Sequence, residues 1–153
     1  MLSRTFLFKY LKENYSINDF SFSYTDIQRP KLKDINIDFN ISYAKDLVAI
    51  AISTKDRIGI DIEYINHSFD IENTANYFMN EEESNRFNSL KDKERFDYYY
   101  KLWTFKEALL KLTGKGLHDD LKEITNFETN GLKISRYQPF ISKDYHLCIT
   151  KYK

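Results

Sequence analysis

The feature that most constrains this fold is a long, largely apolar segment at residues 92–113 that ends with the letters KLWTFKEALLKLT. Apolar residues recur in it at helical spacing, so one helix of about this length is expected. Asp92 can cap its start, and Gly114 can end it, because glycine adopts the left-handed conformation that closes many helices. A helix this apolar has to be packed against a core over most of its surface.

Three charged side chains interrupt this helix, namely Lys106, Glu107 and Lys111. Glu107 and Lys111 are four residues apart and lie on one helical face, with Lys106 beside them. One interpretation is a surface ion pair, which would contribute only about 0.3–0.5 kcal/mol. The other follows from Trp103 and Leu110, which share the side of Lys106 and Glu107 and indicate partial burial. A half-buried acid between two lysines is a candidate metal ligand, with lysines that suit phosphate oxygens.

The segment RIGIDIE, residues 57–63, alternates with a period of two and predicts a strand. Its isoleucines then form one face, while Gly59, Asp61 and Glu63 form the other. Two carboxylates at this spacing repel each other, and a divalent cation with oxygen ligands, such as Mg²⁺, would relieve the repulsion. Gly59 is expected to leave room for a ligand. An ordinary amphipathic strand with its polar face in water is the alternative.

The remaining segments predict a mixture of helices and strands without regular alternation, which favours the α+β class. Asn80 followed by glutamates has the pattern of a capping box, and Ser3 can cap an early helix. Pro30 marks a turn or an extended loop. The predicted elements are a helix at 3–14, a helix that follows Asn80, and strands at 20–24, 47–53 (buried on both faces), 57–63, 132–136 and 145–151.

Composition excludes several classes of protein. The chain has 153 residues, which suits a single domain over 1–153, and 23 basic residues balance 23 acidic ones. A zero net charge argues against a general nucleic-acid binder. The single cysteine, Cys148, allows neither an internal disulfide nor a cysteine zinc site. No signal peptide and no run of about 20 apolar residues is visible, so a cytoplasmic location without membrane contact is expected.

Three motifs occur in an order and at a spacing that resemble those of a known family. They are FNIS at 39–42, IGIDIE at 58–63 and KLWTFKEALLKLTGKGL at 101–117. Together they resemble the 4′-phosphopantetheinyl transferase superfamily, in particular the larger type that activates surfactin synthetase. The resemblance covers about residues 3–150. It implies an antiparallel sheet with packed helices in two pseudo-symmetric halves. Here the first half, about 1–57, is shortened, and the second spans about 58–153.

The resemblance also implies an activity. Such enzymes move the phosphopantetheine arm of coenzyme A onto a serine of an acyl or peptidyl carrier protein, with Mg²⁺, and release 3′,5′-ADP. By motif position, Asp61, Glu63 and Glu107 would bind the metal, and Lys106 and Lys111 would bind the pyrophosphate. Glu107 would accept the serine proton, directly or through water. Lys111 would stabilise charge that develops during transfer.

The nucleotide-binding positions depart from the family pattern. Ser42 would contact the 3′-phosphate of the nucleotide, but Tyr43 stands where a histidine is usual and brings no charge. Arg29 stands where a Gly-Lys-Pro loop has its lysine, and its guanidinium could serve the same phosphate. Glu82 matches a further acidic position, although the acidic residues on both sides blur that alignment by one residue.

Two other functions stay open. A catalytically weak or inactive relative would bind coenzyme A or a carrier protein without transfer, as Tyr43 and the shortened first half allow. An unrelated Mg²⁺-dependent phosphotransfer enzyme is disfavoured, because no Walker-type loop is present. The shortened half is also expected to expose a sheet edge or an apolar patch, which a second copy of the chain would cover.

Overall fold

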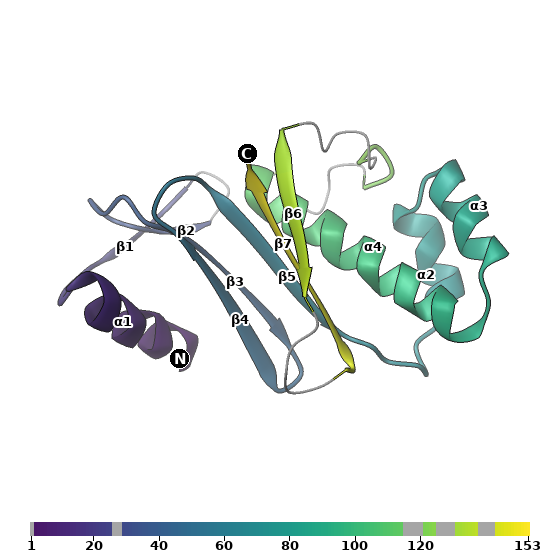
Figure 1. The fold of residues 1–153 in the computed structure, drawn as a ribbon, viewed down its shortest axis with the longest axis horizontal. Helices are drawn as coiled ribbons and strands as arrows, with labels where there is room; N and C mark the ends of the chain where they lie inside the picture. Colours follow the sequence, from purple (N-terminus) through teal and green to yellow (C-terminus); the bar gives the residue numbers. More distant parts are fainter. Residues whose placement is uncertain (1, 26–28, 115–120, 125–130, 138–142) are drawn as a thin grey trace.

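The structure is a computed structural model that describes residues 2–25, 29–114, 121–124, 131–137 and 143–153. Figure 1 shows these residues as an α+β arrangement, which confirms the predicted class. The helices are α1 (Leu2–Tyr15), α2 (Ile71–Phe78), α3 (Glu81–Ser89) and α4 (Asp92–Thr113). The strands are β1 (Phe22–Tyr24), β2 (Pro30–Leu32), β3 (Asp38–Ala44), β4 (Leu47–Ser53), β5 (Ile58–Tyr64), β6 (Leu132–Tyr137) and β7 (Tyr145–Tyr152). Within the described residues, no helix combines the length and apolarity that a membrane crossing needs.

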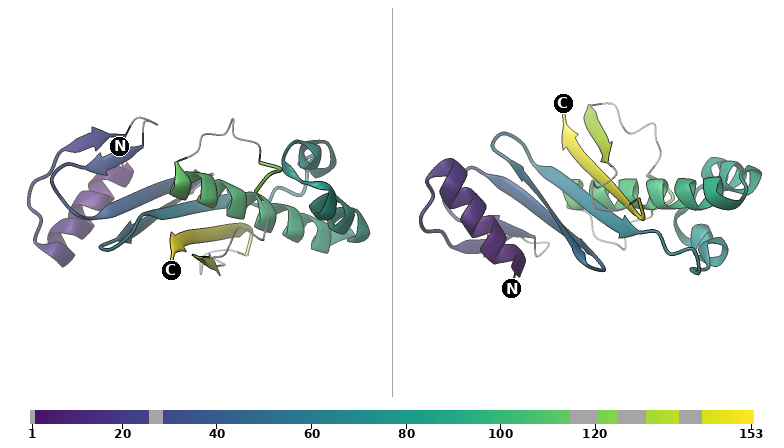
Figure 2. Two further views of the ribbon diagram at one scale, coloured as in Figure 1. Left: turned by 90° about the horizontal axis from the view of Figure 1, so that it is seen from above. Right: turned by 60° about the horizontal axis from the view of Figure 1, so that its bottom comes forward.

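The strands form three antiparallel sheets, ordered β1–β2, β3–β4 and β5–β7–β6. The molecule is elongated, with α1 at one end and α2 and α3 at the other (Figure 1). Helix α4 runs through the middle, close to β5 and β7 in both views of Figure 2. The long apolar helix predicted from the sequence is therefore the element on which β5, β7, α2 and α3 pack.

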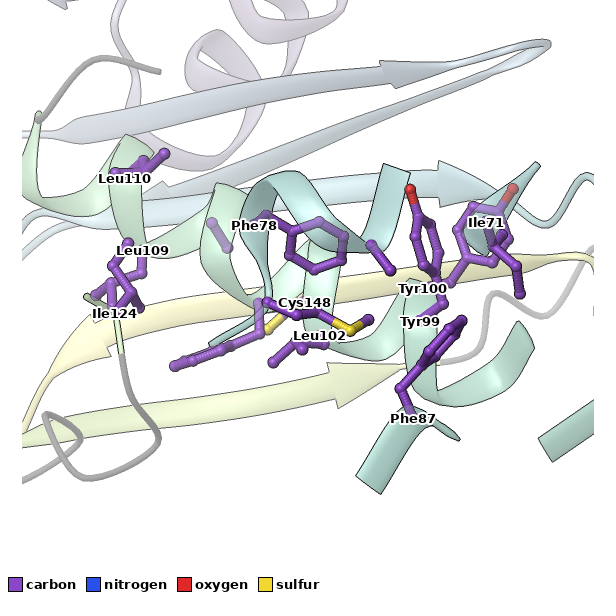
Figure 3. Close-up of a cluster of buried hydrophobic side chains, with 14 of the residues drawn as sticks. Ile71, Phe78, Phe87, Tyr99, Tyr100, Leu102, Leu109, Leu110, Ile124 and Cys148 are labelled. Carbon is purple, nitrogen blue, oxygen red and sulfur yellow. The ribbon is translucent and has the colours of Figure 1, made fainter. Parts of the chain in front are cut away.

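The main core lies between α4, the two short helices and β7. Figure 3 shows its apolar side chains converging from these elements, with Cys148 of β7 among them. Phe78 of α2 makes edge contacts with Tyr99 and Trp103 of α4, at centroid distances of 5.3 and 5.0 Å. Such edge-to-face aromatic pairs stabilise a core beyond the area they bury, by about 0.5–1.5 kcal/mol each. This packing anchors one end of α4.

Strand β3 lies beside β5 without a backbone ladder between them. Instead, every second side chain of β3 accepts a hydrogen bond from a backbone N–H group of β5. The pairs are Asp38 with Ile58 at 2.8 Å, Asn40 with Ile60 at 2.9 Å and Ser42 with Ile62 at 3.3 Å. The shared period of two makes this match possible, and it satisfies donors that a free strand edge would leave unpaired. The motif DFNIS thus joins the β3–β4 sheet to the β5–β7–β6 sheet.

Several local predictions are confirmed. Asn80 and Glu83 form the complete capping box at the start of α3. Gly114 ends α4 in the left-handed conformation with φ of 79°. Helix α1 and strands β5, β6 and β7 occupy the predicted segments within one or two residues.

Other local predictions need correction. The N-cap of α4 is Lys91 without a side-chain cap bond, and Asp92 is the first helical residue. The segment after Pro30 is a short strand that pairs with β1, not a loop. Strand β4 is not buried on both faces, because Val48 is 46% exposed on the side of α1. Ser3 lies within α1 and shares a hydrogen bond with Tyr43 in place of capping the helix.

Candidate functional site

The site depends on how closely α4 approaches β5, and Gly59 sets that distance. A Cβ atom on Gly59 would lie 2.0 Å from the carbonyl oxygen of Ala108 and 2.8 Å from the amide nitrogen of Leu112. Only glycine permits this approach. Gly59 therefore makes room for a helix, which corrects the expectation that it leaves space for a ligand. Ala108 lies between Glu107 and Lys111, so the same contact brings both charged side chains to the polar face of β5.

Asp61 is the centre of the resulting network and is only 3% exposed. Lys111 donates from Nζ to Asp61 Oδ1 at 2.7 Å and to Ser42 Oγ at 2.9 Å. The Ser42 hydroxyl donates to the same Asp61 oxygen at 2.8 Å. Residues from β3, β5 and α4 thus meet at one carboxylate oxygen, which joins all three sequence motifs at a single point.

Glu63 lies one step further along the same face of β5. Its Oε1 accepts a hydrogen bond from Trp103 Nε1 at 2.9 Å. Beyond it opens a groove of about 420 Å³ with mostly aromatic walls from β5, α2 and α4. Trp103 was predicted only as a core residue, and its indole N–H is the group that orients Glu63.

The carboxylates of Asp61, Glu63 and Glu107 influence one another electrostatically. Burial, reinforced by the negative charges of Asp61 and Glu63, raises the pKa of Glu107 to about 7. Burial also raises the pKa of Asp61 and of Glu63, and for Glu63 the charge of Asp61 adds to the effect. The positive charge of Lys111 opposes the rise in the pKa of all three acids. The structure therefore brings together the three predicted acids and one of the two predicted lysines.

Whether these residues suit a metal ion can be judged from the carboxylate oxygens that have no hydrogen-bond partner. Asp61 Oδ2 and Glu107 Oε1 are buried and have no hydrogen-bond partner among the described residues. Buried carboxylate oxygens without partners are unfavourable, and they are the ligand type that Mg²⁺ prefers. As they stand, however, no three acidic, histidine or cysteine side chains of the described residues form a ready set of metal ligands. Asp61 and Glu107 fit the ion, whereas Glu63 is turned toward Trp103.

Lys106 is not part of this cluster, which corrects the prediction that it binds pyrophosphate. Its side chain is fully buried on another side of α4. Its Nζ donates to Glu83 Oε2 at 2.6 Å and to the carbonyl oxygens of Phe78 and Leu121, both at 2.8 Å. Three protein acceptors match the three protons of an ammonium group. Glu83 therefore forms the ion pair with Lys106, whereas the sequence pointed to its neighbour Glu82.

Arg29 is also placed differently from the prediction. Its buried guanidinium donates to Asp38 at 2.6 Å, to the carbonyl oxygens of Phe39 and Ile58, and to that of Lys111. The last contact satisfies one of the carbonyl groups that the end of α4 leaves unpaired. Arg29 therefore joins the ends of β3, β5 and α4, and this role leaves its guanidinium directed inward and not toward a nucleotide phosphate.

Ser42 and Tyr43 point to opposite faces of β3, as neighbours in a strand must. Ser42 is buried in the Asp61 network, so its hydroxyl is already bonded on the inner face. Tyr43 is 61% exposed on the outer face and bonds to Ser3 of α1 at 2.6 Å. The predicted phosphate contacts from Arg29, Ser42 and Tyr43 are thus not gathered in one place.

Comparison with known proteins agrees with the motifs. Residues 57–152 match the family model described as the 4′-phosphopantetheinyl transferase superfamily, and the chain belongs to this family. It is 37% identical to the 4′-phosphopantetheinyl transferase HetI of a Nostoc species over 79 residues, which is 52% of this chain and 33% of HetI. It is 36% identical to the transferase Sfp of Bacillus subtilis over 101 residues, which is 65% of this chain and 44% of Sfp.

These relatives are longer than the chain. The chain spans about a third to a half of the length of the curated relatives it matches. Among solved structures, the holo-[acyl-carrier-protein] synthase of Thermotoga maritima aligns with a TM-score of 0.49 and 18% identity, over 63% of this chain and 62% of that one.

Proposed function

We propose that this chain takes part in transferring the phosphopantetheine arm of coenzyme A to a serine of an acyl or peptidyl carrier protein, with release of 3′,5′-ADP. The observation that carries the proposal is the approach of α4 to β5 at Gly59, which brings Glu107 and Lys111 to Asp61. Membership of the 4′-phosphopantetheinyl transferase superfamily supports the same reaction.

Asp61 and Glu107 would hold Mg²⁺ through their unpaired oxygens, with Glu63 as a third ligand after it turns from Trp103. When bound, the ion supplies positive charge that neutralises the pyrophosphate of coenzyme A. Lys111 provides an ammonium group 2.7 Å from Asp61 Oδ1 and would pair with the phosphate oxygens on which charge develops. The Glu107 carboxylate would accept the serine proton, directly or through water.

The aromatic groove next to Glu63 is the part of the surface best suited to the carrier protein. Phe69 and Tyr77 are 43% and 80% exposed beside it, although both are large apolar side chains. Exposed aromatic residues at a groove are typical of interaction surfaces. A carrier bound here would place its serine close to Glu63, which lines the groove.

The division into a first half, about 1–57, and a second half, about 58–153, is also proposed, and the start of the family match at residue 57 supports it. The first half leaves apolar side chains uncovered. Tyr43 and Val48 face each other across the β3–β4 pair, and both are exposed, as is Phe6 one turn along α1 from Ser3. A second copy of the chain would bury this patch, and light scattering that shows only monomers would contradict that part of the proposal.

The test of the activity is a mass measurement. The protein is mixed with coenzyme A, Mg²⁺ and an apo carrier protein, and the carrier is weighed. We expect the mass gain of one phosphopantetheine, lost in Asp61→Ala and in Glu107→Ala. Glu13→Ala, which changes an exposed carboxylate of α1, is the matched control and should keep the activity. A mass gain that survives both site substitutions would contradict the proposal.

The second candidate function is a relative that binds coenzyme A or a carrier protein without transfer. The inward-facing guanidinium of Arg29 and the uncharged Tyr43 favour it, because both leave fewer charges for the nucleotide phosphates. Binding of coenzyme A in calorimetry, together with an unchanged carrier mass, would select this function over transfer.

A further inference from the structure

The ammonium group of Lys111 lies in the acidic cluster formed by Asp61, Glu63 and Glu107, next to the buried carboxylate of Asp61. Its ammonium lies 2.7 Å from Asp61 Oδ1 and 2.9 Å from Ser42 Oγ. It is also the positive charge that Asp61, Glu63 and Glu107 all experience. Among the described residues these acids do not form a ready set of metal ligands, and the ammonium of Lys111 occupies one oxygen of Asp61.

We propose that Lys111 is an exchangeable cation of this cluster: its ammonium neutralises Asp61 in the metal-free protein and leaves when a divalent ion binds the same carboxylate. A divalent ion held by Asp61 Oδ2 would lie on the same carboxylate as the ammonium bonded to Oδ1, and it would repel that ammonium twice as strongly as a monovalent ion would. The ion would also supply the positive charge that neutralises Asp61, so the contact between Lys111 and Oδ1 loses its electrostatic advantage. The inference rests on the metal site proposed above.

The surroundings of Lys111 allow its side chain to leave while its backbone stays. The side chain is 28% exposed, whereas that of Asp61 is only 5% exposed, so the lysine has a path to solvent. Arg29 holds the carbonyl oxygen of Lys111, and the amide of Gly114 bonds to Leu110, which together fix the last turn of α4. Only the side-chain torsions of Lys111 have to change, as expected for a long, flexible side chain.

The released ammonium would then be available to phosphate oxygens next to the ion. The backbone of Lys111 stays in place beside Asp61 when the ion binds. Its partly exposed side chain can therefore still reach phosphate oxygens that are bound to the ion. The metal-free contact with Asp61 and a later contact with pyrophosphate are thus two positions of one side chain. Metal binding is the event that moves it from the first to the second.

The first test measures how fast Lys111 reacts with an amine-acylating reagent, by peptide mass spectrometry, without coenzyme A. Mg²⁺ should raise the acylation rate of Lys111 several-fold, because its ammonium loses two hydrogen-bond partners. Lys101 lies on the same helix in an ion pair with Asp97 and serves as the control, with an unchanged rate. Lys106 is fully buried and should stay unreactive, which reports that the fold is intact.

The second test measures Mn²⁺ affinity by calorimetry for the wild type, Lys111→Met and the control Lys101→Met. Removal of the competing ammonium should tighten Mn²⁺ binding by at least about fivefold, a coupling at the lower end of the usual range. Lys101→Met should leave it unchanged.

The outcomes distinguish a failure of the proposed lysine exchange from a failure of the proposed metal site. Mn²⁺ binding to the wild type with an unchanged or lower acylation rate of Lys111 would overturn the exchange and leave the metal site standing. No Mn²⁺ binding to the wild type or to Lys111→Met would overturn both. A rise in the rate of Lys111 together with tighter binding by Lys111→Met supports the exchange.

Discussion

The raised pKa of Glu107 predicts how a single substitution changes stability with pH. The carboxyl has an ordinary pKa of 4.5 in the unfolded chain and a pKa of about 7 in the folded protein. Between these values the folded state holds a proton that the unfolded state has released. The stabilising contribution of Glu107 is therefore complete below about pH 4.5 and is lost as the pH rises through about 7.

The magnitude follows from the size of this shift. One unit of pKa corresponds to about 1.36 kcal/mol, so a shift from 4.5 to about 7 corresponds to about 3 kcal/mol. Solvent screening at this partly exposed residue makes that value an upper limit. Glu107→Gln imitates the protonated acid at every pH. The variant should match the wild type near pH 4.5 and be more stable at pH 8, by up to about 10 °C in Tm.

The assay is thermal unfolding by circular dichroism at a series of pH values between 4.5 and 8.5, with a chelator present. Glu13→Gln removes an exposed carboxylate of α1 and should show no such pH-dependent difference. The reasoning is refuted when the difference in Tm between Glu107→Gln and the wild type is the same at pH 5 and pH 8. It is also refuted when the variant becomes less stable as the pH rises.

Three further predictions concern the supports of the site. Gly59→Ala should lower the free energy of unfolding by more than about 3 kcal/mol in urea titration, because its Cβ would overlap the Ala108 carbonyl and push α4 away from β5. Lys106→Met should cost about 3–5 kcal/mol, since Glu83 is left buried without its partner, and adding Glu83→Gln should recover part of that loss. Asn80→Ala should cost about 1 kcal/mol in the same assay through loss of the capping box.

The parts of the fold that the sequence predicts well are those with strong local signals. The period-two isoleucines of β5, the capping box at Asn80 and the left-handed Gly114 each depend on residues within a few positions of one another. The two acids of β5 and Glu107 could be connected in advance only through a family resemblance. Their close approach depends on Gly59. From the sequence alone, a glycine at this position can make room for a ligand or for a neighbouring helix, and the structure shows a helix.

The residues whose placement differs from the expected one share a physical cause. Lys106, Arg29 and Ser42 are polar residues that sequence reasoning assigned to a ligand, and the structure uses each as an internal hydrogen-bonding group. Whether a charge faces a ligand or a buried partner depends on contacts across the chain, such as Lys106 with Glu83, which no local pattern contains. Tyr43 could be placed on the opposite face from Ser42 by strand alternation alone, once β3 was identified as a strand.

The most direct test of the central claim is a double-substitution experiment on Mn²⁺ binding. Calorimetry is carried out on the wild type, Asp61→Asn, Glu107→Gln and the protein with both changes. When the two acids share one ion, either substitution weakens binding strongly and the second adds little, because the effects of coupled residues do not sum. Effects that simply add, or an unchanged affinity in either single variant, would show that Asp61 and Glu107 do not form one metal site.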